Sequence, residues 1–147
     1  MDWVASRHGL LYATEYGFDA SFEVLVAQIC SDFSEHFIPG KERCWIAERD
    51  GRRVGSVFCV QESPSVAKLR LLLIEPGARG LGLGQRLVRE CIAFARDAEY
   101  KKIVLWTNSV LYAARGIYSH EGFKIIDSES HQSFGRQLSG ETWELLL

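Results

Sequence analysis

Helical spacing of apolar positions dominates the first part of the chain. From residue 22 to residue 33 an apolar side chain recurs at helical intervals, and Asp19 stands where it can cap this predicted helix. The stripe consists of Phe22, Leu25, Val26, Ile29, Cys30 and Phe33. Before it, the pattern predicts a short strand at residues 3–7 that ends at His8-Gly9, and a short helix at residues 10–16 that stops at Gly17.

The middle of the chain carries strand patterns. Residues 44–48 and 54–61 are predicted as two strands joined by Asp50-Gly51, a dipeptide typical of tight hairpins. Residues 67–74 predict another strand, whose second half is wholly apolar. A strand of that kind is normally covered on both faces, so we expect it to be central in its sheet.

Helices and strands alternate in the remainder of the chain. The pattern predicts a helix at residues 85–98, a strand at 103–106, a helix at 110–120, and strands at 123–126 and 143–147 with a polar loop between them. Caps for the second of these helices are offered by Thr107, Asn108 and Ser109. The whole order predicts an α/β protein in which helices pack on a mixed sheet.

Length, charge and cysteines narrow the class of protein. A chain of 147 residues fits one domain, residues 1–147, and 47% hydrophobic with 24% charged residues is typical of a globular protein. The net charge of −2 gives no general attraction for nucleic acid, and no apolar run is long enough to span a bilayer. The cysteines lack zinc-site spacing, and the first residues lack a secretory pattern. We therefore expect a cytoplasmic protein with reduced thiols and no metal, nucleic-acid or membrane site.

A glycine-rich segment after the apolar strand carries the main functional signal. Residues 71–86 read LLLIEPGARGLGLGQR, so a buried strand runs into a loop that opens a helix. Glycines allow the backbone to approach a ligand closely, and free amides at a helix start attract anions. Arg79 adds a side-chain donor for phosphate. The segment therefore predicts a site for a phosphate-bearing ligand.

Spacing excludes two other nucleotide-binding loops. A P-loop ends in a lysine followed by serine or threonine, and no lysine follows these glycines. A dinucleotide-binding loop needs a further glycine where this chain has Gln85. It also needs an acidic residue at the end of the next strand, which here reads Trp106-Thr107-Asn108.

Two motifs give the chain a resemblance to a known family. Residues 79–84, RGLGLG, match the R/Q-x-x-G-x-G/A signature of the GNAT acetyltransferases, and residues 114–123, ARGIYSHEGF, resemble that family's A-x-x-L-Y-x-x-x-G-F motif. The resemblance implies a central, mixed, mostly antiparallel twisted sheet of about six to seven strands, flanked by about four helices. Residues 3–17, 105–107 and 131–135 further resemble acetyltransferase domains that are fused to MarR-type regulators.

The resemblance implies that acetyl-CoA binds at the glycine-rich segment as acetyl donor, without a metal. The loop would hold the pyrophosphate, and the end of the preceding strand would hold the pantetheine chain. Tyr118, one helical turn after the small Ala114, is the expected general acid that protonates the departing sulfur. The expected cofactor-binding residues are Leu72, Leu73, Ile74, Arg79, Gly80, Leu81, Gly82, Leu83, Gly84, Asn108 and Ala114.

Several parts of the implied mechanism stay open. The reaction would be direct attack of a primary amine, from a small molecule or peptide, on the thioester; the alternative is a non-catalytic acetyl-CoA sensor module of a MarR-type regulator. Leu111 stands where relatives often have asparagine, while Asn108 lies where capping is the simpler role. The oligomeric state is undecided, with a homodimer among the options. Candidates for the general base are Glu62, Glu75, His120, His131 and a bound water, and the acceptor pocket is expected to border Tyr12, Glu15, Tyr16, His131 and Phe134.

Overall fold

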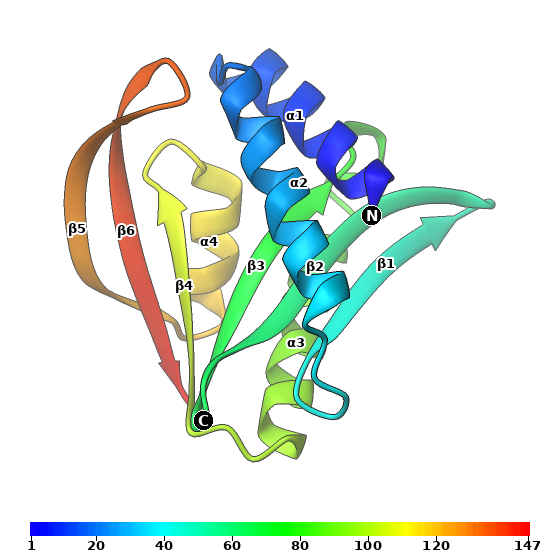
Figure 1. The fold of residues 1–147 in the computed structure, drawn as a ribbon, viewed down its shortest axis with the longest axis vertical. Coiled ribbons are helices and arrows are strands. Elements are labelled where there is room, and N and C mark those ends of the chain that lie inside the picture. The colour runs from blue at the N-terminus through cyan, green and yellow to red at the C-terminus, as the bar shows by residue number, and fades with distance from the viewer.

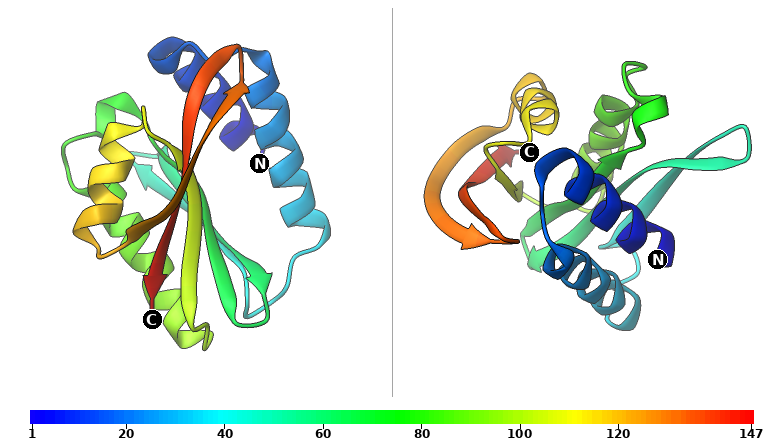
Figure 2. Two further views of the ribbon diagram at one scale, coloured as in Figure 1. Left: turned by 90° about the vertical axis from the view of Figure 1, so that its left-hand side faces the viewer. Right: turned by 90° about the horizontal axis from the view of Figure 1, so that it is seen from above.

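A six-stranded sheet lies between two pairs of helices in the computed structural model, which describes residues 1–147. Helices α1 (Asp2–Tyr16) and α2 (Ala20–Glu35) cover one face. Helices α3 (Leu83–Asp97) and α4 (Tyr112–His120) cover the other, and the side view in Figure 2 separates the three layers. The expected architecture of helices on both faces of a mixed sheet is confirmed.

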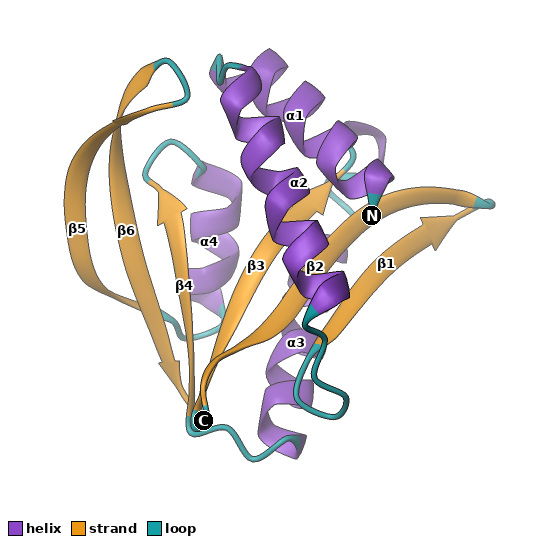
Figure 3. Cartoon of the chain, viewed as in Figure 1, coloured by secondary structure: helices purple, strands orange, loops and turns teal.

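The sheet is antiparallel except at one junction in its middle. Its strands are β1 (Arg43–Arg49), β2 (Arg52–Ser63), β3 (Val66–Ile74), β4 (Lys102–Asn108), β5 (Lys124–Ser133) and β6 (Arg136–Leu146). Their order is β1-β2-β3-β4-β6-β5, and only β3 and β4 are parallel. Figure 3 distinguishes these strands from the helices and loops. The predicted hairpin around Asp50-Gly51 joins β1 to β2, and β3 is central as expected.

Strands β3 and β4 pair over a short stretch and then separate. Their parallel pairing runs only from Val66 opposite Lys102 to Lys68 opposite Val104. Figure 1 shows the two arrowheads diverging beyond this point. Leu71 has a φ of 54° beside an irregular register with β2, which is a β-bulge that bends β3 away. The second half of β3 therefore has a free backbone edge on the β4 side.

The core has two parts, one on each side of the sheet. Helix α3 is strongly amphipathic and faces the sheet with Leu87, Val88, Cys91, Ile92 and Ala95, all of them buried. On the other face, α1 and α2 close over Phe58 of β2 with Val4, Ala5, Val26 and Cys30. All four cysteines of the chain are free thiols, and three of them are buried.

The strand predicted at residues 3–7 is wrong, because α1 runs unbroken from Asp2 to Tyr16. Val4, His8 and Leu11 are buried at helical spacing, which holds the segment on the sheet as a helix. Gly9 is not a helix breaker here. A Cβ at Gly9 would lie 2.7 Å from the Cβ of Glu23, so this glycine allows α1 and α2 to pack closely.

The polar loop predicted between residues 126 and 143 is also wrong. Strands β5 and β6 continue through it as a long hairpin, turned by Phe134 and Gly135 with φ values of 56° and 76°. The tip is held from outside the hairpin, since the Phe134 carbonyl accepts a bond from the Asp19 amide at 2.9 Å and its ring stacks on Phe18. Because β5 is a solvent-exposed edge strand, most of its residues are polar although they form a regular strand.

The start of α4 differs from the predicted helix at residues 110–120. The helix begins at Tyr112, and its N-cap position is Leu111, which makes no side-chain capping bond. Asn108 is the last residue of β4 and its side chain bonds to His131 instead, with Oδ1 at 2.9 Å from Nε2. The capping role expected for Asn108 is therefore wrong.

Candidate functional site

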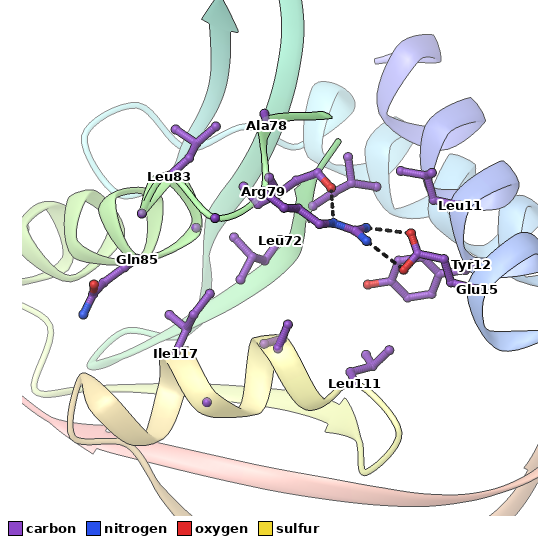
Figure 4. A pocket seen from close by; sticks show the side chains of 18 of the residues that line it. Leu11, Tyr12, Glu15, Leu72, Ala78, Arg79, Leu83, Gln85, Leu111 and Ile117 are labelled. Carbon is purple, nitrogen blue, oxygen red and sulfur yellow. Dashed lines mark hydrogen bonds and ion pairs between the residues drawn. The ribbon is translucent and has the colours of Figure 1, made fainter. Parts of the chain in front are cut away.

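A cleft of about 650 Å³ opens beside the free edge of β3. Its walls are the second half of β3, the loop that leads into α3, the inner side of α4 and the end of α1. Leu72 and Ile117 lie on opposite sides of it in the close view of Figure 4. The free edge of β3 and the glycine-rich loop therefore line the same cleft.

The loop presents free backbone amides to this cleft. It passes through the short helix η1 (Pro76–Ala78), and Gly80 and Gly82 then take φ values of 80° and 75°. Gly82 is the N-cap residue of α3 and, lacking a side chain, leaves the first amides of that helix without a capping bond. No atom lies within 4 Å of a Cβ built at Gly80 or Gly82. Uncapped amides, the helix dipole and open space together make a site for an anion such as a pyrophosphate.

Arg79 of this loop is already bound within the protein. Its guanidinium donates to both carboxylate oxygens of Glu15 on α1, at 2.7 and 3.0 Å, and to the Ile74 carbonyl at 3.1 Å. Figure 4 shows this link crossing between the loop and α1. The hydrogen bonds to Glu15 raise the pKa of Arg79. The pair thus joins the loop to α1 at the rim of the cleft, and it engages both carboxylate oxygens of Glu15, a residue expected to border the acceptor pocket.

Tyr118 faces a second, smaller cavity of about 220 Å³ and does not line the main cleft. The two spaces are adjacent, because they share Tyr12, Leu72, Leu111 and Ala114 as walls. Phe123 and Trp143 hold the Tyr118 ring, with centroids 5.8 and 6.0 Å away. Burial raises the pKa of Tyr118 far above its ordinary value, so its hydroxyl stays protonated at neutral pH.

Most of the residues expected to bind the cofactor line the main cleft. These are Leu72, Leu73, Ile74, Arg79, Gly80, Gly82, Leu83, Gly84 and Ala114. Two of the expected residues lie elsewhere. Leu81 is 62% exposed at the loop surface, and Asn108 lines only the smaller cavity. The spacing of the motif predicted the loop, but it could not tell which side chains turn away from it.

The residues considered as general base are spread over the molecule. Glu75 is bound by Arg7, with two hydrogen bonds of 2.5 and 2.7 Å, and Glu62 lies at the surface near Lys68. His131 bonds to Asn108 and Ser133, while His120 lines the main cleft. His8 was missed, because it was read as the end of a strand; its helical spacing with Val4 and Leu11 was the signal that could have revealed a buried histidine.

Comparison with known proteins identifies the family. Residues 11–123 match the acetyltransferase (GNAT) family. The chain belongs to this family. It is 33% identical over 100 residues to human N-acetyltransferase 8B, covering 64% of this chain and 44% of that protein. It is 32% identical over 103 residues to the N-acetylaspartate synthetase of Xenopus tropicalis, covering 69% and 38%. The chain thus spans less than half the length of these two relatives.

Solved GNAT structures share the fold. An acetyltransferase from Streptococcus agalactiae superposes with a TM-score of 0.73 at 21% identity, over 99% of this chain and 91% of that one. A GNAT family acetyltransferase from Elizabethkingia anophelis, solved with acetyl-CoA bound, superposes with a TM-score of 0.66 at 15% identity, over 82% of each chain. These likenesses confirm the mixed α/β GNAT fold.

The expected cytoplasmic location and the expected fusion to a MarR-type regulator receive no support from these matches, and both stay predictions. No helix combines the length and the apolar character needed to cross a membrane.

Proposed function

We propose that this GNAT domain is an acetyl-CoA-dependent N-acetyltransferase that acts on a primary amine. The observation that carries the proposal is the uncapped amino end of α3 opening on a cleft beside the unpaired edge of β3. Related proteins named N-acetyltransferases and a fold neighbour with bound acetyl-CoA support it. In such an enzyme, acetyl-CoA supplies an activated acetyl group on a thioester.

The residues of the cleft fit a donor of this shape. The amides of Gly80–Gly84 and the helix dipole would bind the pyrophosphate, since both favour negative charge. The backbone of Leu72, Leu73 and Ile74 would bond to the amide groups of pantetheine, because β4 leaves that edge unpaired. Ala114 on α4 lines the opposite side of the cleft, and its small side chain leaves room for the donor. The role of the loop is therefore to bind and orient the donor.

Tyr118 is the proposed proton donor. Acetyl transfer to an ammonium group forms one N–C bond, breaks one C–S bond and releases two protons from nitrogen, of which sulfur takes one and solvent the other. Tyr118 holds a proton at its hydroxyl at neutral pH, as any phenol does, and burial raises the pKa of that group further. Its cavity shares a wall with the donor cleft at Leu72 and Ala114. A buried acid next to the departing sulfur lowers the barrier to thiolate departure.

The direct test combines an activity assay with a binding measurement. We expect thiol release from acetyl-CoA when the protein is mixed with a suitable primary amine from a broad panel, and acetyl-CoA binding by calorimetry without any amine. Binding without turnover on every amine would identify a sensor module in place of an enzyme. If the protein does not bind acetyl-CoA, the proposal is wrong both for an enzyme and for a sensor module.

A matched pair of glycine variants tests the donor site. Gly82→Val should weaken coenzyme A binding by about tenfold or more, because its side chain would cover the amides that attract the pyrophosphate. Gly51→Val is the control, since Gly51 has the same φ of 75° and equally open surroundings but lies in the β1–β2 turn. Equal affinity of the two variants in calorimetry would show that the loop does not bind the donor.

A further inference from the structure

The smaller cavity that Tyr118 faces has features of a second ligand site. It lies between α1 and α2 on one side and the diverging strands β3 and β4 on the other, and it reaches α4 at Tyr118. Its apolar walls include Phe22, Leu25 and Ile29 of α2. Because it shares residues with the donor cleft, a molecule held there would be close to the donor.

His8 lines this cavity, and one of its ring nitrogens has no hydrogen-bond partner. The residue is 1% exposed, and its Nδ1 lies 2.8 Å from the Val4 carbonyl, so Nδ1 carries the proton and donates. Nε2 then has a free lone pair, and it is the one buried side-chain nitrogen or oxygen of the protein without a partner. Burial lowers the pKa of His8 to about 4 and keeps the ring neutral. An unpaired buried acceptor costs stability unless a ligand donates to it.

Two cations line the same cavity, and no carboxylate lines it with them. Lys68 and Arg70 project from β3, and none of the residues that line the cavity is acidic. Arg70 forms no ion pair, and Lys68 has only a long one to Glu62 at 3.8 Å. Burial lowers the pKa of Arg70, and the more distant charges of Glu62 and Asp32 only partly offset this. A wall with this charge favours an anionic group and disfavours a simple ammonium ion.

We propose that this cavity binds the acetyl acceptor and that the acceptor is a small amine that also carries a carboxylate. The inference rests on the proposed N-acetyltransferase function. Arg70 and Lys68 bind the carboxylate, because a guanidinium fork matches its two oxygens. His8 Nε2 accepts a hydrogen bond from the amine, and Phe22, Leu25 and Ile29 contact the apolar part of the molecule. The neutral histidine suits an N–H donor and needs no proton transfer of its own.

Matched pairs of amines test the carboxylate requirement. The pairs are alanine with ethylamine, leucine with 3-methylbutylamine and phenylalanine with phenethylamine, which differ only in the carboxylate; leucinamide replaces the charge by a neutral amide. We expect kcat/KM for the best amino acid to exceed that of its partner amine about 10- to 100-fold, as charge-assisted hydrogen bonds give. The amide should behave like the simple amine.

Variants connect the preference to the cavity. Arg70→Gln should reduce the ratio of kcat/KM between amino acid and partner amine about tenfold or more, while Arg52→Gln, an exposed arginine outside the cavity, should keep it. His8→Phe keeps an aromatic ring without Nε2, and it should raise KM for every amine. Acetyl-CoA affinity and melting temperature report whether each variant is folded.

The readouts separate failure of this inference from failure of the proposed function. Acetylation of the amines without a preference for the carboxylate, or an unchanged preference in Arg70→Gln, would overturn the inference and leave the enzyme. If no amine is acetylated, calorimetry on the protein saturated with coenzyme A still tests the carboxylate site, because it measures the affinity for both members of each pair. Tighter binding of the amino acid that Arg70→Gln abolishes would support the carboxylate site, and equal binding of both members of every pair would reject it.

Discussion

Burial shifts the pKa values of Tyr118 and His8 in opposite directions. Both line the smaller cavity, and in both burial is the largest cause of the pKa shift. It raises the pKa of the phenol and lowers that of the imidazole to about 4, since each shift favours the neutral form. At neutral pH Tyr118 therefore keeps a proton that it can donate, and His8 keeps a lone pair that can accept. The two residues offer complementary chemistry from α4 and α1.

Replacement of Tyr118 by phenylalanine tests its role as an acid. The change removes one hydroxyl and keeps the ring against Phe123 and Trp143, so folding should be nearly unaffected. We expect kcat to fall about 10²-fold, as is typical for loss of a general acid. KM for acetyl-CoA should change little, because the lost interaction belongs to the transition state. Steady-state kinetics under conditions where chemistry limits the rate provide the measurement.

The control for this variant is Tyr112→Phe. Tyr112 lies on the same helix but is 74% exposed, so loss of its hydroxyl should leave kcat unchanged. The Tyr118→Phe defect should also shrink with a thioester whose thiol has a lower pKa, because a better leaving group needs less help from an acid. A Tyr118→Phe protein as active as the unmutated one would leave Tyr118 as a core residue only.

At the scale of elements, the start of α3 packs tightly against α4. Gly84, in the first turn of α3, is buried, and a Cβ there would lie 2.7 Å from Cδ1 of Ile117. Gly82 has open space around the same position. The glycines of the loop therefore serve two purposes: Gly82 leaves the amides free, and Gly84 allows α3 and α4 to approach. A sequence motif shows both simply as glycine.

A double-mutant cycle can test the packing role of Gly84. We expect Gly84→Ala to destabilise the fold by about 1–3 kcal/mol, because the new methyl group meets Ile117. Ile117→Val removes the contacting Cδ1 and alone should cost about 0.5–1.5 kcal/mol. The double variant should lose less free energy of unfolding than the sum of the two single losses, as measured by denaturant unfolding. Strict additivity would mean that Ile117 is not what excludes a side chain at Gly84.

At the scale of the whole molecule, the cleft exists because distant parts of the chain are tied together. The Arg79–Glu15 pair joins the glycine-rich loop to α1. The β5–β6 tip binds the segment between α1 and α2, where the Arg136 guanidinium also donates to the Tyr16 carbonyl at 2.5 Å. Ligand binding at the cleft therefore depends on the complete fold, and a ligand should stabilise that fold as a unit.

A thermal shift assay measures this coupling. Coenzyme A or acetyl-CoA at about 100 times its Kd should stabilise the protein by about 2.7 kcal/mol, which is a rise of roughly 5–10 °C in Tm for a chain of this size. NAD and ATP should produce a much smaller shift at equal concentration, because the loop lacks the spacing of their binding motifs. A larger shift with NAD than with coenzyme A would contradict the assignment of the donor.

The sequence alone determined those features that depend on local pattern. The stripe of α2, the Asp50-Gly51 hairpin and the apolar half of β3 follow from periodicity and turn chemistry, which act over a few residues. The loop from Gly80 to Gly84 was found for the same reason, since its amides and positive φ values are properties of the local backbone. The first family motif, residues 79–84, lies in this loop.

Only the tertiary structure decided the rest, because those features depend on what lies across the molecule. His8 became a buried histidine with a free Nε2 when α1 packed on the sheet, and β5 is a strand because it pairs along its length with β6. The partner of Arg79 is Glu15, a residue far away in the sequence. The cavity behind Tyr118 exists because β3 and β4 separate, and neither strand encodes that separation by itself. The surroundings of the predicted loop depend on long-range side-chain packing and strand pairing, which a local sequence pattern does not specify.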